Sequence, residues 1–174
     1  TIGEGLYSID VADADGDGDL DVLTIGTNES YPSWHKSNAS ESPASLSFTQ
    51  YNLMSTINDG RSAAWGDMDG DLDMDIVACS YGDHKISWYE NDGNQNFTSY
   101  DISTKADGAQ SVYATDIDGD GDDDIIWRKL DTGLIYIWIM ENGSIASKYS
   151  LRAVSPNWEI VGAGDLNGDE TVLR

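Results

Sequence analysis

The sequence predicts an all-β fold made of repeated four-stranded units, and three observations support this prediction. An Asp-rich segment recurs four times along the chain at nearly even spacing. Short runs of apolar and β-branched residues alternate with clusters of Gly, Asn and Asp, which is the pattern of strands joined by tight turns. No segment shows the helical spacing of apolar side chains that an amphipathic helix requires.

Two features of the repeat keep the same phase. The Asp-rich segments begin at Asp13, Asp67, Asp116 and Asp165. Trp34 and Trp88 follow the first Asp of their segments at the same distance, and Trp138 follows its own at a distance one position longer. Because loop and tryptophan recur together, we expect a repeated structural unit in which the three tryptophans pack at equivalent places.

The second unit shows the expected elements most clearly. Its predicted strands are Ser62–Gly66, Ile76–Tyr81, Lys85–Glu90 and Phe97–Ile102. The Asp-rich loop joins the first two strands, and Gly, Asp and Asn at 82–84 and 92–94 predict turns between the others.

Units of this kind predict a β-propeller. A small four-stranded antiparallel sheet cannot bury its two faces alone, and propellers stack such sheets as blades. We predict one partial propeller over residues 1–174, with blades at about 4–52, 58–104 and 108–153 and an incomplete blade at 157–174. A stacked linear β-array is the alternative. About three and a half blades fall short of a closed ring, so further blades or self-association should complete it.

The charge balance excludes some partners. The chain has 32 acidic and 9 basic residues and a net charge of −23, so nucleic acid and anionic membranes would be repelled. No apolar run approaches the length of a membrane-spanning helix. The one cysteine, Cys79, lies in an apolar run and is expected to be a buried thiol.

The acidic residues are gathered where a cation could bind, because 18 of the 32 lie in the four Asp-rich loops. Carboxylates at loop positions 1, 3, 5 and 9, with a carbonyl from position 7, can supply the six to eight oxygens that Ca²⁺ prefers. Without a cation they would repel one another. The predicted calcium ligands are Asp13, Asp15, Asp17, Asp19 and Asp21 in loop one; Asp67, Asp69, Asp71, Asp73 and Asp75 in loop two; Asp116, Asp118, Asp120, Asp122 and Asp124 in loop three; and Asp165, Asn167 and Asp169 in loop four.

These loops differ from one another and from an EF-hand. An EF-hand closes its shell with a Glu at position 12, whereas here an Asp at position 9 would close it between two strands. Position 6 should have positive φ and is glycine in loops one and three, but Leu72 occupies it in loop two. We therefore expect weaker calcium binding or a distorted backbone in loop two. Loop four lacks the closing Asp, so about three ions are expected, with a weak fourth.

The loop pattern D-x-[DN]-x-D-G-x-x-D between two strands resembles the FG-GAP/VCBS repeats of integrin α-subunit propellers, fungal propeller lectins and many secreted bacterial proteins. Lys85–Gly93, Asp107–Val112 and Asn157–Asp169 extend this resemblance over nearly the whole chain. It implies a propeller, usually of seven blades, with structural calcium between the first two strands of each blade. It does not define a ligand, because members of the family adhere, bind sugars or accompany enzymes.

The function predicted from these features is a non-catalytic, calcium-binding adhesion or binding module for carbohydrate or protein, in a secreted or cell-surface protein. Extracellular calcium matches the affinity of about 10⁻⁴–10⁻³ M found in extracellular modules. Turns near 31–34, 82–84 and 105–108 would form the face opposite the loops, where Trp34 and His35 could contact a sugar, although core packing is the stronger interpretation of Trp34. The alternatives are a pure scaffold and a polysaccharide lyase or hydrolase, for which His84 and Lys85 beside Asp83 form the one candidate catalytic cluster.

Overall fold

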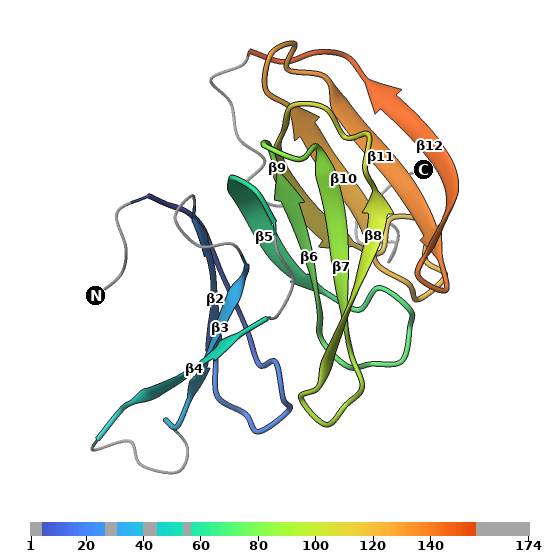
Figure 1. The fold of residues 1–174 in the computed structure, drawn as a ribbon. Coiled ribbons are helices and arrows are strands. Elements are labelled where there is room, and N and C mark those ends of the chain that lie inside the picture. The colour runs from blue at the N-terminus through green and yellow to red at the C-terminus, as the bar shows by residue number, and fades with distance from the viewer. Residues whose placement is uncertain (1–4, 27–30, 40–44, 54–56, 156–174) are drawn as a thin grey trace.

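The computed structural model describes residues 5–26, 31–39, 45–53 and 57–155, and in these ranges the fold is all-β (Figure 1). Three antiparallel sheets of four strands follow one another along the chain. Sheet one contains β1 (Leu6–Ala12), β2 (Asp21–Gly26), β3 (Ser33–Ser37) and β4 (Phe48–Asn52). Sheet two contains β5 (Gly60–Gly66), β6 (Asp75–Ser80), β7 (Lys85–Asn91) and β8 (Phe97–Ser103). Sheet three contains β9 (Ala109–Thr115), β10 (Asp124–Lys129), β11 (Ile135–Glu141) and β12 (Ser144–Leu151).

The strands of sheet two agree with the sequence prediction to within two positions at every end. Each sheet is a meander in which consecutive strands pair. The turns expected at 82–84 and 92–94 are present, with positive φ at His84 and Gly93. No helix of the described ranges is long and apolar enough to cross a membrane.

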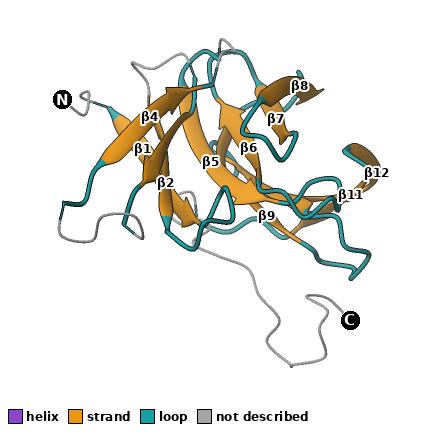
Figure 2. Ribbon diagram, turned by 90° about the horizontal axis from the view of Figure 1, so that it is seen from below, coloured by secondary structure: helices purple, strands orange, loops and turns teal. Residues whose placement is uncertain are grey.

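The sheets stack face to face as propeller-like blades, with β1, β5 and β9 side by side (Figures 1 and 2). In the described part of the chain the stack does not close into a ring. One hydrophobic cluster fills the space between sheets one and two, and a second fills the space between sheets two and three. Because sheet two is covered on both sides, β6 is buried along its whole length. Cys79 lies on this strand, and burial raises the pKa of its thiol to about 12.

The tryptophan of the third repeat does not occupy the place of the other two. Trp34 pairs with Leu23 and Trp88 with Val77, each of which lies two positions after the Asp at loop position 9. Trp138 pairs with Ile125, which directly follows that Asp. Successive side chains of a strand point to opposite faces, so this shift by one position turns Trp138 to the other side of its sheet.

The packing follows from this reversal. Trp34 and Trp88 pack against the sheet that follows their own, whereas Trp138 packs back against sheet two in the same cluster as Trp88. The prediction of equivalent tryptophan packing is therefore right for Trp34 and Trp88 and wrong for Trp138. The one additional position between Asp116 and Trp138 was the signal of the difference.

The outer face of sheet one is apolar and open. Tyr7, Ile9 and Val11 alternate along β1 with side chains that face the second sheet, and Ile9 is 61% exposed. The matching positions of β5, Ala63 and Trp65, are buried against sheet one. The exposed face of β1 thus has the residue types of an interface between blades but has no described sheet upon it.

Candidate metal centres and the adjoining pocket

The three described Asp-rich loops, at 13–21, 67–75 and 116–124, have the same hydrogen-bond pattern. In each loop the carboxylate at position 1 accepts a hydrogen bond from the backbone N–H of position 6, at 2.9 to 3.1 Å. The carboxylate at position 5 accepts one from the N–H of position 7, at 2.9 to 3.0 Å. These local bonds fold the loop over its own side chains and turn the carboxylates inward.

Position 6 has positive φ in each of the three described loops, as the sequence predicts. The angle is 91° at Gly18, 74° at Leu72 and 103° at Gly121. Leu72 keeps the hydrogen bonds of the other loops, so the distortion expected in loop two is absent. Its side chain is 88% exposed and contributes little packing in return for the strained backbone.

Carboxylates converge in each loop. One ligand atom from each member of a trio lies within 4.8 Å of the others. The trios are Asp13, Asp15 and Asp17 in loop one; Asp67, Asp69 and Asp71 in loop two; and Asp116, Asp118 and Asp124 in loop three. Positions 1 and 3 therefore meet in all three loops, with position 5 in the first two and position 9 in the third.

Several of these oxygens are buried without a protein donor. Oδ1 of Asp13, Oδ1 of Asp15 and Oδ1 of Asp69 have no hydrogen-bond partner within the described structure. A buried carboxylate oxygen without a partner is costly and is satisfied by a proton or a cation. An all-oxygen site of convergent carboxylates suits Ca²⁺, so the residues present fit the metal that their pattern predicts.

Position 9 has a structural task in all three loops. Both oxygens of Asp21 accept hydrogen bonds, one from the Trp34 indole at 2.9 Å and one from the N–H of Ser37 at 2.7 Å. Asp75 repeats this with Trp88 and Asn91 and also accepts from the N–H of Met68. Asp124 accepts from the N–H groups of Ile117 and Met140. These buried carboxylates tie each loop to the third strand of its sheet, and those of Asp75 and Asp124 also bond the second position of the loop.

The remaining predicted ligands lie outside the trios. Asp19 and Asp122 are buried, and Asp122 accepts a hydrogen bond from the N–H of Asn142. Asp73 lies against the turn at Gly93, where an added Cβ would overlap its carboxylate. Asp120 accepts from its own loop. Asp165, Asn167 and Asp169 of loop four lie outside the described residues.

Burial raises the pKa of several loop carboxyl groups. The pKa of Asp75 is raised to about 7, chiefly because the group is buried, and that of Asp124 to about 6 for the same reason. The pKa of Asp69 is raised to about 6 by burial, with further contributions from the charges of Asp71, Glu90 and Asp67. Loops two and three therefore hold carboxyl groups that resist ionisation unless a cation is near.

A residue of the third strand distinguishes loop one from loop two. The Lys36 ammonium of β3 contacts the Asp15 carboxylate and lies 3.4 Å from that of Asp17. The same position of β7 is Glu90, whose charge adds to that of Asp69. Neither residue was predicted from sequence, because no local motif links a loop to a side chain on the third strand. Aligning the repeats on their Asp residues would have revealed the Lys-to-Glu difference.

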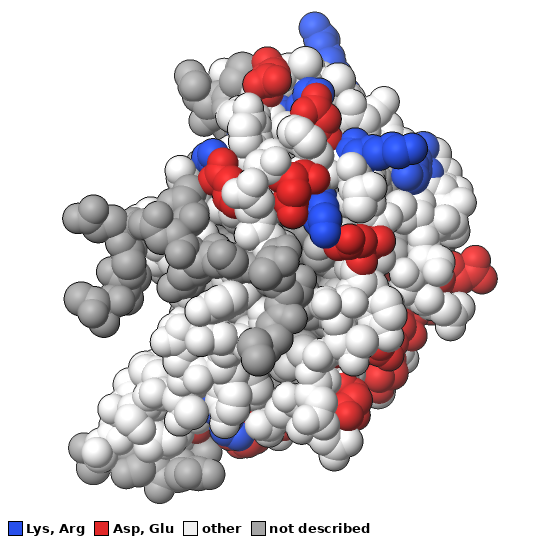
Figure 3. All heavy atoms as spheres, viewed as in Figure 1, with Lys and Arg blue, Asp and Glu red and all other residues white. Residues whose placement is uncertain are grey.

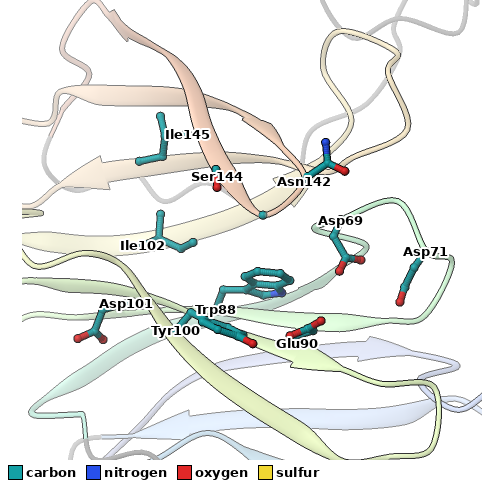
Figure 4. Close-up of a pocket in the computed structure, with 11 residues that line it drawn as sticks. Asp69, Asp71, Trp88, Glu90, Tyr100, Asp101, Ile102, Asn142, Ser144 and Ile145 are labelled. Atoms are coloured by element: carbon teal, nitrogen blue, oxygen red, sulfur yellow. The ribbon is translucent and has the colours of Figure 1, made fainter.

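A pocket of about 690 Å³ adjoins loop two, between sheets two and three (Figure 4). The Tyr100 ring lies against that of Trp88, with centroids 5.1 Å apart, and is 44% exposed. Glu90 lies beside the two rings, while Asn142 and Ser144 lie on the opposite side of the pocket, at the hairpin between β11 and β12. The pocket thus combines an exposed aromatic face with carboxylate and amide groups.

The hairpin closes this pocket through close contact with Trp88. Asn142 and Gly143 have φ of 48° and 68°, as a tight hairpin turn of type I′ requires. A Cβ at Gly143 would overlap the Trp88 ring, so only glycine allows this approach. The turn therefore packs sheet three against the Trp88 ring of sheet two.

The comparisons with known proteins agree with the repeat and its loops. A family model described as FG-GAP-like repeat matches residues 13–78 and 67–127. The chain belongs to the FG-GAP-like repeat family. The two matches begin at Asp13 and Asp67, the first Asp of loops one and two, so the family repeat and the structural repeat coincide.

A solved structure with a related fold is that of a lectin from Agrocybe aegerita, described as recognising non-reducing terminal N-acetylglucosamine. It matches this FG-GAP-like chain with a TM-score of 0.57 and 16% sequence identity, over 84% of this chain and 38% of the lectin chain. The chain thus spans well under half the length of that lectin, and at this identity the likeness concerns the fold alone. A comparison with curated proteins finds no match.

Two other predicted sites in this FG-GAP-like chain are rearranged by the fold. Trp34 is 1% exposed and bonded to Asp21, so it cannot present its ring to a sugar, as its repeat phase already favoured. His35, which the sequence placed with Trp34 on the face formed by the turns, lies in β3 and contacts the Thr24 hydroxyl at 3.0 Å. His84, in contrast, lies in an exposed turn.

The cluster of Asp83, His84 and Lys85 is divided among different partners. His84 Nδ1 lies 3.4 Å from Asp107, and Lys85 pairs with Asp101 at 2.8 Å. Asp83 accepts a hydrogen bond from the Ser80 hydroxyl. The three side chains therefore do not face a common point.

Proposed function

We propose that this chain is a non-catalytic, calcium-binding module of a secreted or cell-surface protein, and that it binds carbohydrate in the pocket between sheets two and three. Calcium would be held by the carboxylate trios of the three loops and would stabilise the blades. The saccharide would lie on Tyr100 and exchange hydrogen bonds with the polar rim.

The observation that carries the metal assignment is the set of buried carboxylate oxygens without partners at positions 1 and 3. Asp13, Asp15 and Asp69 each turn such an oxygen into the loop. Each trio offers only oxygen atoms as metal ligands, and the three described loops, which have similar backbone conformations, each contain such a trio. Membership of the FG-GAP-like family supports both the calcium and the extracellular location.

The saccharide assignment is supported by the composition of the pocket. Sugar rings present an apolar face that packs on an exposed aromatic ring, and their hydroxyl groups donate to carboxylates. Tyr100 supplies the ring, while Glu90, Asp101 and Asn142 supply polar groups around it. The lectin with the related fold makes a carbohydrate the first ligand class to test.

We also propose that the exposed face of β1 receives a further blade. Ile9 and Val11 occupy the positions that are buried between sheets one and two at Ala63 and Trp65. The three described sheets do not close into a ring, which leaves this face open to an additional blade.

Thermal unfolding with calcium and with chelator tests the metal assignment. We expect calcium to raise the unfolding midpoint by at least about 5 °C, because three ions bound only to the folded state would each add stability. Asp118→Asn should remove part of this increase, whereas Asp131→Asn, in an exposed turn outside the loops, should not. Equal midpoints with calcium and chelator would refute calcium binding.

A glycan array followed by calorimetry tests the saccharide assignment. Tyr100→Ala should abolish binding of the saccharides that the unmodified chain retains. Tyr51→Ala is the matched control, because Tyr51 stacks on Trp34 in sheet one with centroids 4.8 Å apart but does not line the pocket. Retention of binding by Tyr100→Ala would place the saccharide elsewhere.

We assign no catalytic role to the chain. Incubation with polysaccharides that contain uronic acids should therefore yield no new unsaturated ends. Turnover that disappears in His84→Ala would contradict this assignment and favour the lyase alternative.

A further inference from the structure

A second pocket between sheets two and three gathers basic residues that are rare in this chain. Of the nine Lys and Arg residues in the chain, three line this cavity of about 400 Å³: Lys105, Lys129 and Lys148. In the face shown in Figure 3, Lys and Arg side chains lie mainly in the upper part with Asp and Glu side chains among them, and further Asp and Glu run along the lower right edge. The pocket therefore gathers a third of the basic residues of a strongly acidic molecule.

The wall of this lysine pocket is an aromatic platform built by strand pairing. Trp127 of β10 pairs with Tyr136 of β11, and Tyr136 pairs with Ser150 of β12. The rings of Trp127 and Tyr136 are stacked, with centroids 4.2 Å apart and planes at 13°. Since Trp127 is buried and Tyr136 is half-buried, Tyr136 presents its ring from a rigid support.

The neighbouring row of the same sheet places a positive charge beside this platform. Lys148 pairs with Trp138, and its Nζ lies over the Trp138 ring, 4.6 Å from the centroid. A cation held over an aromatic face keeps its charge while its side chain is oriented. The reversed orientation of Trp138 brings this ammonium group to the pocket.

The positive charge of the pocket exceeds its negative charge. Lys129 pairs at 2.6 Å with Asp107, which is the one acidic side chain of the lining. For Lys105 and Lys148, the described ranges contain no ion pair with a carboxylate. Two ammonium groups are thus available to an anionic ligand at the rim of an aromatic face.

We propose that the lysine pocket binds anionic saccharides, with the sugar ring on Tyr136 and its carboxylate or sulfate between Lys105 and Lys148. This inference rests on the proposed carbohydrate-binding function and adds to it a second site, which selects saccharides of negative charge. The cavity has the size of a small-ligand site, and the hydroxyl groups of Ser103 and Ser150 at its rim can bond sugar hydroxyls. The Tyr100 pocket, which is lined by Asp69, Glu90 and Asp101, would repel the same anion.

Calorimetry on the full chain with calcium present tests this inference. The probes are a glucuronic-acid oligosaccharide, a sulfated oligosaccharide, a neutral glucose oligosaccharide of the same length and a poly-glutamate peptide. We expect the anionic saccharides to bind, and Lys148→Met and Lys105→Met each to weaken them about tenfold or more. Arg61→Met is the control for loss of a cation elsewhere, because Arg61 pairs with Asp59 and lines neither pocket, and it should leave the affinity unchanged.

The probes separate the outcomes. Tighter binding of the glucuronic-acid saccharide assigns the carboxylate as the recognised group, and tighter binding of the sulfated one assigns the sulfate. Poly-glutamate binding without saccharide binding would overturn the inference in favour of an acidic peptide. Binding of the neutral saccharide alone, unaffected by the lysine substitutions, would refute the anionic site but leave the proposed function intact. Absence of all saccharide binding would refute both.

Discussion

Loops one and two share a backbone but differ in how their negative charge is balanced. Both have a trio of convergent carboxylates and the same internal hydrogen bonds. In loop one, Lys36 supplies an ammonium group to Asp15 and Asp17. In loop two, Glu90 occupies that position and adds a negative charge near Asp69.

The shape of a loop and its dependence on a bound cation have different structural origins. Shape follows from local features, namely positive φ at positions 4 and 6 and carboxylates that bond the backbone of their own loop. The dependence on a bound cation is set by the charge of a side chain on the third strand, and this side chain differs between the blades. We therefore expect loop two to depend on calcium more than loop one does.

The largest effect should come from the carboxylate that connects loop two to its sheet. Asp75→Ala would leave the Trp88 indole and the N–H groups of Met68 and Asn91 without their acceptor, at a cost of about 3 kcal/mol in the free energy of unfolding. Denaturant unfolding in chelator measures it. Asp71→Ala, which alters an exposed member of the carboxylate trio in the same loop, is the control and should cost little without calcium. Similar losses for both variants would contradict the structural role of Asp75.

The stability of the metal-free protein should depend on pH through the buried Asp75 of loop two. The pKa of Asp75 is raised by burial from its usual 3.8 to about 7, so between pH 4 and 7 the folded chain keeps a proton that the unfolded chain loses. The metal-free protein should therefore become less stable as pH rises through this window, with a fall in the unfolding midpoint of roughly 5 °C from pH 4.5 to 7. Thermal melts in chelator test this. Asp75→Asn should flatten the profile, and a midpoint that rises with pH would show the opposite sign.

Exchange of the third-strand residue should alter calcium affinity. Lys36→Met removes the ammonium group from loop one and should increase its affinity for calcium about tenfold, equivalent to about 1.4 kcal/mol. Glu90→Gln should weaken calcium binding by loop two. Calcium titration calorimetry measures both, with Lys85→Met as the control for loss of a lysine elsewhere. Unchanged affinity in Lys36→Met would show that the ammonium group moves aside without cost when the metal binds.

The smallest effect concerns the strained backbone of loop two. Leu72→Gly should stabilise the chain by about 1 kcal/mol, because the side chain is exposed and φ is 74°. Leu72→Ala keeps the Cβ and should gain almost nothing. Thermal unfolding of the two variants decides the matter, and equal midpoints would show that the exposed leucine is not strained there.

Most of the fold could be predicted because the signals are local. Turn residues and short apolar runs mark each strand of sheet two to within two positions, and the Asp-rich loops mark the first hairpin of every sheet. The orientation of Trp138 could not be inferred from local signals of this kind. It depends on strand register, where a shift by one position exchanges the two faces of a sheet.

The candidate sites were predictable to a smaller extent. The carboxylates at positions 1 and 3 converge as their spacing predicts, whereas Asp21 and Asp75 serve buried hydrogen bonds to the third strand. Lys36 and Glu90 act from that third strand, and the pockets are formed by two sheets. Such features depend on contacts between segments that no motif brings together.

The loops of neighbouring sheets also contact one another. The carboxylate of Asp123 accepts a hydrogen bond from the N–H of Asp67 at 2.9 Å, and Gly70 leaves no room for a Cβ beside Asp122. Gln95 of sheet two donates to Asp15 of loop one at 3.1 Å. A cation entering one loop would therefore alter the position and charge of groups that shape the next, so we expect cooperative calcium titrations, with a Hill coefficient above unity, rather than those of independent sites.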